Sequence, residues 1–172
     1  SLGLFDNPTT AAHCIYLEPE DFTILAEKQV TIATNPVSNL KLASGICNVA
    51  QAMKQGINIA LGTDSVASNN NLNMFEEIKL YAILHKYYAG DPTIITPSQA
   101  LAAATINGSR SQGRSDSGLI KEGYKADLIV LDIDQPYMKP IHSLLNNVVY
   151  SACGTDVCLT MIDGKVLYKD GV

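Results

Sequence analysis

Residues 1–113 alternate between two patterns of hydrophobic and polar positions. Short apolar runs of the kind that forms buried strands occur at residues 9–16, 30–34 and 57–61. The segments between and after these runs carry helix-start signals and apolar residues at helical spacing. This β-α-β-α-β order predicts parallel strands whose carboxyl ends lie together at one edge of a sheet.

Helix-start signals locate the predicted helices. Proline at an early position predicts a helix over residues 18–28, and a shorter helix is expected over residues 48–55. Asn73 and Thr96 are each followed three residues later by Glu or Gln, which is the capping-box spacing that begins a helix. Pro36 is expected to end the second strand, and the polar residues 37–46 are expected to form a loop.

After residue 113 the period changes to that of strands. We expect strands at residues 126–131 and 147–152, followed by a hairpin over residues 157–168. The hairpin turns at Asp163-Gly164, a pair that suits a type I′ turn. The sequence therefore predicts two domains, an α/β unit over residues 1–113 and a small β unit over residues 114–172.

Composition and charge exclude several classes of function. The 12 Lys+Arg residues against 17 Asp+Glu give a net charge of −5 with no basic cluster, which argues against a nucleic-acid partner. No apolar run approaches the roughly 20 residues of a membrane helix, and the first residues lack the features of a signal peptide. We therefore expect a cytoplasmic protein with no membrane contact. Because there is no initiator methionine, we expect it to be a piece of a longer polypeptide.

The four cysteines form no CxxC pair. A zinc site and a disulfide are both open for them, but we expect buried, reduced thiols.

Three polar residues follow the three predicted strands of the first unit. His13 lies near the end of the first strand, Asn35 follows the second, and Asp64 follows the third in Gly62-Thr63-Asp64. If the strands are parallel neighbours, these side chains converge on one rim, where ligands bind in such folds.

Each of these residues also has a plainer interpretation. Asp64 can bind a metal or accept a proton, but it can equally cap the following turn. His13 can act as an acid, a base or an electrophile, or it can be a hydrogen-bonded core histidine. Turn chemistry explains the neighbouring Ser65, Ser68 and residues 69–71, although substrate contact is open for them.

Several segments resemble the metal-dependent amidohydrolase superfamily. They are His13-Cys14, residues 35–45 (NPVSNLKLASG), Gly62-Thr63-Asp64, residues 68–77 (SNNNLNMFEE) and residues 118–132 (GLIKEGYKADLIVLD). Within the superfamily, residues 35–45 and 68–77 are most similar to the 5-methylthioadenosine/S-adenosylhomocysteine deaminase branch, close to the triazine chlorohydrolase-like enzymes.

The resemblance implies a fold and a chemistry. It implies a TIM-type (β/α)8 barrel with a composite β-sandwich, of which residues 1–113 would supply the last three strand–helix units and residues 114–172 the C-terminal sandwich strands. It implies a zinc cofactor, with Asp64 as the metal-binding, substrate-binding and catalytic carboxylate and His13 as the second catalytic residue. The implied reaction is hydrolytic deamination of a small adenosine-like nucleoside by metal-activated water.

The chain matches only part of the family's pattern. The family's three metal histidines and its catalytic Glu have no counterpart here, because the histidines are His13, His85 and His142, and His85 falls on an apolar helix face. Ser65 also stands where close relatives commonly have Gly. The zinc site is thus expected to be complete only in the parent protein, and the isolated chain is expected to be inactive.

Other functions stay open. A guanine deaminase or a triazine chlorohydrolase-like hydrolase is one alternative, and a non-catalytic amidohydrolase-derived assembly module is another. Because a partial barrel exposes two strand edges, we also expect homo-oligomers or self-association of the isolated chain.

Overall fold

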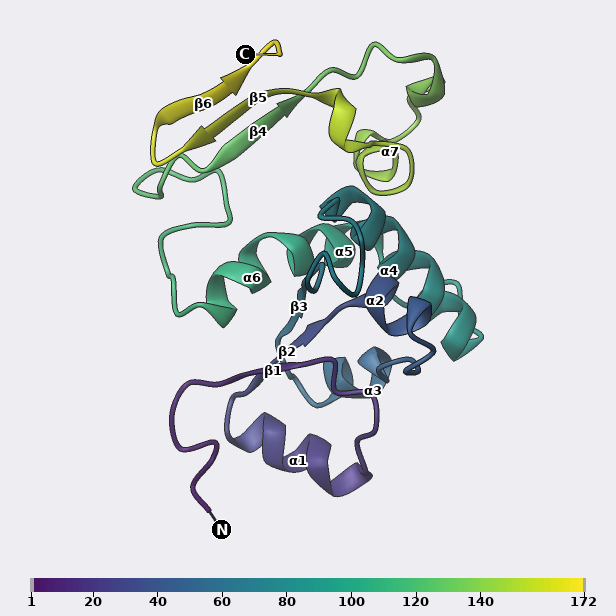
Figure 1. Ribbon diagram of the computed structural model, residues 1–172, viewed down its shortest axis with the longest axis vertical. Coiled ribbons are helices and arrows are strands. Elements are labelled where there is room, and N and C mark those ends of the chain that lie inside the picture. The colour runs from purple at the N-terminus through teal and green to yellow at the C-terminus, as the bar shows by residue number, and fades with distance from the viewer. Residues whose placement is uncertain (1, 172) are drawn as a thin grey trace.

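The computed structural model describes residues 2–171 and places two three-stranded sheets in that part of the chain (Figure 1). The first sheet consists of β1 (Thr10–Ala12), β2 (Thr31–Thr34) and β3 (Ile59–Leu61), in that order. Both of its pairings are parallel. The predicted parallel arrangement of successive strands is therefore confirmed.

Helices follow each strand of this sheet. They are α1 (Pro19–Glu27), α2 (Pro36–Lys41), α3 (Val49–Lys54), α4 (Met74–Ala89), α5 (Pro97–Ala104) and α6 (Ile106–Ser111). A hydrophobic core lies between strands and helices, and it includes Phe22, Val30, Ile32, Val49, Ile59, Ile78 and Tyr81. Burial of apolar side chains in this layer gives the first sheet most of its stability.

Local sequence fixes where several of these helices begin. Thr96 and Gln99 form the reciprocal capping box at the start of α5, as predicted. Asn73 caps α4 by accepting a hydrogen bond from the backbone N–H of Phe75, but Glu76 does not return the bond and accepts from Asn71 instead. The predicted helix start is thus correct, although the predicted reciprocal box is not formed.

The expectation of a loop over residues 37–46 is only partly correct. The first part of this segment forms α2, which begins at Pro36 and ends at Lys41. Proline is favoured at the first helical position because its missing N–H would have no partner there. Pro36 therefore has two roles, since it ends the extended segment of β2 and also begins a helix, and the sequence analysis identifies only the first.

The second sheet is antiparallel and lies in the C-terminal part of the chain. It consists of β4 (Leu128–Leu131), β5 (Val157–Ile162) and β6 (Lys165–Lys169). Asp163 and Gly164 both have positive φ at the β5–β6 turn, as a type I′ turn requires. Two short 3-10 helices, η1 (Pro136–Met138) and η2 (Gly154–Asp156), complete this part.

The predicted strand over residues 147–152 is wrong, because these residues largely belong to the helix α7 (Leu144–Tyr150). Ser143 caps α7 by accepting from the backbone N–H of Asn146. Val149 is buried in the core of the first sheet's helices, and Lys86 of α4 donates to the Tyr150 hydroxyl at 2.9 Å. Segment 114–172 is therefore not made of strands alone, and one of its elements packs on α4 and α5.

Two further observations bear on the sequence analysis. In the part of the chain that the structure describes, no helix combines the length and the apolar character needed to cross a bilayer. All four cysteines are free thiols, of which Cys47 is fully buried and the other three are partly buried.

Candidate functional site

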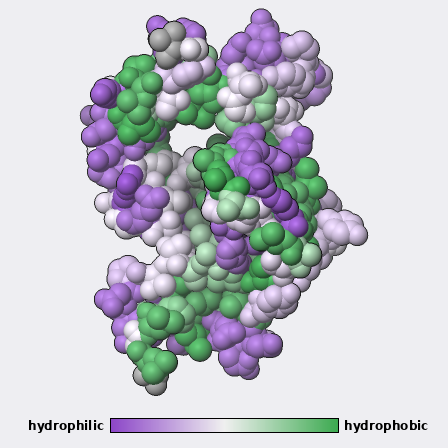
Figure 2. Space-filling model, in the orientation of Figure 1, coloured by the Kyte–Doolittle hydropathy of each residue, from purple (hydrophilic) through white to green (hydrophobic). Residues whose placement is uncertain are grey.

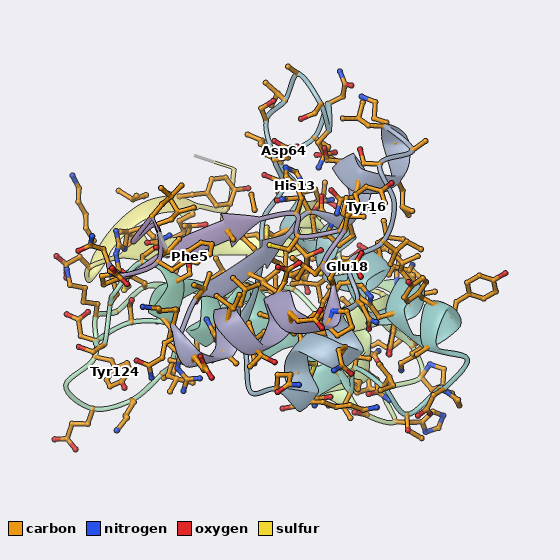
Figure 3. The ribbon with its side chains drawn as sticks, turned by 90° about the horizontal axis from the view of Figure 1, so that it is seen from below. Phe5, His13, Tyr16, Glu18, Asp64 and Tyr124 are labelled. Carbon is orange, nitrogen blue, oxygen red and sulfur yellow. The ribbon has the colours of Figure 1, made fainter. Side chains whose placement is uncertain are left out.

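The carboxyl ends of the three parallel strands bring the predicted site residues together. The His13 Nε2 atom lies 3.9 Å from Asp64 Oδ2, and the Asn35 Nδ2 atom lies 3.3 Å from His13 Nδ1. Figure 3 shows His13 and Asp64 side by side beyond the ends of the strands, on the same side of the molecule as Tyr16. The predicted convergence of these three side chains is confirmed.

The backbone of the β1–α1 connection aims the His13 ring. His13 has a φ of 66°, and its N–H donates to the carbonyl of Ala33 at 2.8 Å, which extends the pairing with β2 by one residue. His13 Nδ1 lies 2.7 Å from Asn39 Oδ1. Because that oxygen can only accept, the contact assigns a proton to Nδ1, and Nε2 faces Asp64.

Asn35 and Gly62 pack against each other beneath His13. The Asn35 amide is buried and donates to the carbonyl of Ala33. A Cβ atom on Gly62 would lie only 2.4 Å from Asn35 Oδ1. A glycine at the end of β3 therefore leaves the room that the Asn35 side chain occupies.

The Asp64 carboxylate is held by two hydrogen bonds. The Ser38 hydroxyl donates to Oδ2 at 2.6 Å, and the backbone N–H of Ser65 donates to Oδ1 at 2.7 Å. These bonds, of which that from Ser38 has the largest effect, together with a smaller contribution from the Ser68 side chain, hold the pKa of the Asp64 carboxyl below its ordinary value. Asp64 is therefore an ionised carboxylate at neutral pH, and its side chain is 27% exposed beside a His13 side chain that is 41% exposed.

Ser38 and Asn39 are site residues that the sequence analysis does not identify. Both lie in α2, are almost fully buried and contact Asp64 and His13 respectively. The signal that could have found them is Pro36, since a helix beginning there places its first turns beside the strand ends.

Of the other candidates, Ser65 contacts Asp64 through its backbone N–H and Ser68 helps to lower the Asp64 pKa, whereas His85 and His142 do not join the site. Ser65 and Ser68 contact each other through their hydroxyls, consistent with the turn interpretation. His85 is buried in α4, and His142 is exposed in a loop. His85 is buried, as its position on an apolar helix face predicted, but its Nε2 atom has no hydrogen-bond partner in the described part of the chain.

The residues present fit one position of a metal site. Among residues 2–171, no three His, Cys, Asp or Glu side chains are grouped to hold a metal ion. An ionised, partly exposed carboxylate such as Asp64 suits zinc as a single ligand, but a catalytic zinc site has about three protein ligands. This chain by itself therefore supplies one of the ligands that a zinc ion would need, and not a complete zinc site.

The chain is similar in sequence to a known protein family and to named relatives. The model of the amidohydrolase family matches residues 1–167. The chain is 49% identical over 168 residues to the 5-methylthioadenosine/S-adenosylhomocysteine deaminase of Dictyoglomus thermophilum, covering 98% of this chain and 39% of the relative. It is 46% identical over 166 residues to the 5'-deoxyadenosine deaminase of Methanosarcina acetivorans, covering 96% and 38%.

A solved structure shares the fold. The zinc-bound adenosine deaminase of Xanthomonas campestris superposes with a TM-score of 0.91 at 37% identity, over 94% of this chain and 37% of that one. The chain thus spans well under half the length of the relatives and of the solved structure that it matches.

Proposed function

The chain belongs to the amidohydrolase family, and from that premise we propose that it is the C-terminal portion of a zinc-dependent aminohydrolase. The proposed substrate is an adenosine-like nucleoside of the 5-methylthioadenosine/S-adenosylhomocysteine type. The observation that carries the proposal is the approach of His13 Nε2 to within 3.9 Å of the ionised Asp64 carboxylate at the strand ends. The names of the relatives support the nucleoside class.

The proposal requires the rest of a longer polypeptide. Within the described residues, β1 and β3 each pair on one side only, so both edges of the parallel sheet can accept another strand. We propose that further strands close it into a (β/α)8 barrel, with residues 1–113 as the last three strand–helix units and residues 114–172 in an adjoining β-sandwich. The remaining zinc ligands would then come from the other barrel strands.

The two site residues would have different roles. A zinc ion held in part by Asp64 would supply the acidity that makes water a nucleophile near neutral pH. Asp64 would use its ionised carboxylate as a ligand, orient the reacting groups and accept a proton. His13, with Nδ1–H donated to Asn39, would hold or move a proton at Nε2. In the net reaction, water replaces the amino group on the ring carbon and ammonia leaves.

The proposal is tested with the full-length polypeptide that contains this chain. Zinc content is measured by elemental analysis, and ammonia release is followed with 5-methylthioadenosine, S-adenosylhomocysteine, adenosine and guanine, while hydrolysis of a chlorotriazine is followed by chloride release. We expect about one zinc per chain and ammonia release from the adenosine-type substrates. His13→Gln should lower kcat/KM by roughly 10²- to 10⁴-fold with zinc retained, and Asp64→Asn should lower both activity and zinc content.

Asp91→Asn is the matched control, because Asp91 is also a loop aspartate held by hydrogen bonds, here from Thr93, but it lies outside the site. It should leave kcat/KM within about twofold. Hydrolysis of guanine or of the chlorotriazine alone would replace the proposed substrate with one of these alternatives. A full-length protein without zinc and without activity on the panel would contradict the enzyme and favour an assembly module.

A further inference from the structure

Helix α4 carries a buried carboxylate that the proposed chemistry does not use. Glu77 is the fourth residue of α4, and its side chain is 0% exposed. Among the described residues no Lys, Arg or His forms an ion pair with it. A buried carboxyl without a cation is costly unless it is satisfied by hydrogen bonds, so its partners are informative.

Both oxygens of Glu77 accept hydrogen bonds, and they come from two separate segments. Oε2 accepts from the backbone N–H of Val37 at 3.1 Å, in the first turn of α2. Oε1 accepts from Nδ2 of Asn69 at 2.7 Å, in the loop that follows Asp64. Burial raises the pKa of Glu77, and these two bonds oppose that change.

Each of the two segments directly adjoins Asp64. Val37 precedes Ser38, whose hydroxyl donates to Asp64 Oδ2 at 2.6 Å. Asn69 Nδ2 also donates at 2.6 Å to the carbonyl of Thr63, the residue before Asp64. Glu77 thereby connects the helix that supplies the hydroxyl to the loop that supplies the carboxylate.

The neighbours of the Asn69 side-chain amide determine which way it faces. Both of its neighbours, Glu77 Oε1 and the Thr63 carbonyl, are acceptors, so Nδ2 must face them. As a result Asn69 Oδ1 is buried with no hydrogen-bond partner in the described part of the chain. An unsatisfied buried acceptor is costly, so the two bonds that Nδ2 donates fix the orientation of the amide although its oxygen has no partner.

We propose that Glu77 is a positioning residue, which through Val37 and Asn69 fixes the Ser38 hydroxyl and the Asp64 carboxylate in the geometry that faces His13. Glu77 accepts its hydrogen bonds from Val37 and Asn69, and within the described part of the chain none joins it to His13 or Asp64. The inference rests on the proposed function for its kinetic consequence, but its geometric consequence is independent of any activity.

Glu77→Gln in the full-length polypeptide is the main test. Glutamine has nearly the same size, but it replaces one acceptor oxygen with an amide that faces either the Val37 N–H or the Asn69 amide, so one bond becomes a repulsive contact. Because a misplacement of about 1 Å in a catalytic group can cost about 10²-fold in rate, we expect kcat to fall roughly 10- to 100-fold with KM within about twofold. Glu76→Gln is the matched control, since Glu76 is the exposed neighbour on the same helix, and it should change kcat by less than about twofold.

A second variant keeps the proposal falsifiable if Glu77→Gln does not fold. Asn69→Ala removes the link to Thr63 but leaves the Val37 bond, and it should lower kcat by roughly tenfold, less than Glu77→Gln. Crystal structures of the wild-type protein and of whichever variant folds give the readout that needs no activity. They should show the 2.6 Å contact between Ser38 Oγ and Asp64 Oδ2 lost in the variant.

The outcomes separate the two proposals. An inactive wild-type protein whose variant loses the Ser38–Asp64 contact would defeat the proposed function and support the positioning role. An unchanged Ser38–Asp64 contact in the variant would overturn the positioning role, whatever the activity. In an active enzyme, a kcat within twofold of wild type for both variants would also overturn it.

Discussion

The two sheets of this protein contrast in how their apolar side chains are covered. Ile32 in the parallel sheet is 0% exposed under its layer of helices. In the antiparallel sheet, the adjacent residues Val166 and Leu167 are 46% and 57% exposed, and adjacent strand residues point to opposite faces. Both faces of β6 are therefore open, and Figure 2 shows hydrophobic surface over this sheet.

Strand composition alone does not decide whether the side chains of a sheet are buried. Both sheets are built from similar apolar residues, but only the first has helices following each strand to cover it. Most buried polar groups lie in the first region, among them Asn35, Ser38, Glu77 and His85, whereas Ser117 and Asp156 are buried in the second region. The candidate site thus lies on the helix-covered sheet, which suits a preorganised site.

Truncating a buried and an exposed strand residue should change the free energy of unfolding by very different amounts. Ile32→Ala should lower the free energy of unfolding by about 2–5 kcal/mol, because it leaves a cavity in a packed core. Val166→Ala, at an exposed position of β6, should change it by less than about 1 kcal/mol. Chemical denaturation of this chain checks both values. Equal losses for the two variants would contradict the contrast.

A pH-dependent effect should arise in the first region. Burial lowers the pKa of His85 to about 4 from its ordinary value of 6.5. Between these values the unfolded chain binds a proton that the folded chain does not, so this contribution is fully favourable above pH 6.5 and is lost as the pH falls toward 4. The expected loss is on the order of 3 kcal/mol.

His85→Phe is the variant that isolates this effect. Phenylalanine keeps a ring against Tyr81, which contacts His85 edge-on with centroids 4.9 Å apart, but it does not titrate. Denaturation of both proteins at several pH values between about 7.5 and 4.5 should show a shallower decline for the variant. Parallel curves would mean that His85 does not carry the dependence.

Replacing one glycine in each region with alanine should change the stability only slightly, and in opposite directions. Gly164 has a φ of +77° in the β5–β6 turn, and Gly164→Ala should destabilise by about 1 kcal/mol because a side chain disfavours that conformation. Gly108 lies within α6, where a Cβ atom would have open space around it. Gly108→Ala should stabilise by about 0.5–1 kcal/mol. Thermal unfolding measures both, and the same sign for the two substitutions would contradict this explanation.

Much of the first region could be predicted from the sequence because its signals are local. The capping box of Thr96 and Gln99 and the apolar runs of β2 and β3 each act over a few residues. The convergence of His13, Asn35 and Asp64 followed from strand order alone, since parallel neighbours bring their carboxyl ends to one edge.

The errors arose where a residue's partner is distant in the sequence. The apolar residues around Val149 fit a strand as well as a helix, and packing against α4 and α5, with the Ser143 cap, favours the helix. The role of Glu77 depends on partners outside its own helix, Val37 and Asn69, which are 40 and 8 residues away. A carboxylate on the buried face of a helix was the available signal, beside Ile78 and Tyr81.

The packing of α7 on α4 and α5 joins the two regions by a contact that is separate from the backbone between them. The chain leaves α6 at Ser111 and returns to the helical layer at Leu144, so it forms a loop whose two ends are both anchored. Val149 is 1% exposed in the core. Its burial holds α7 against the helices independently of the backbone that joins α6 to β4. If a protease cut the chain between α6 and β4, the two fragments should therefore stay associated through the packing of α7 on α4 and α5.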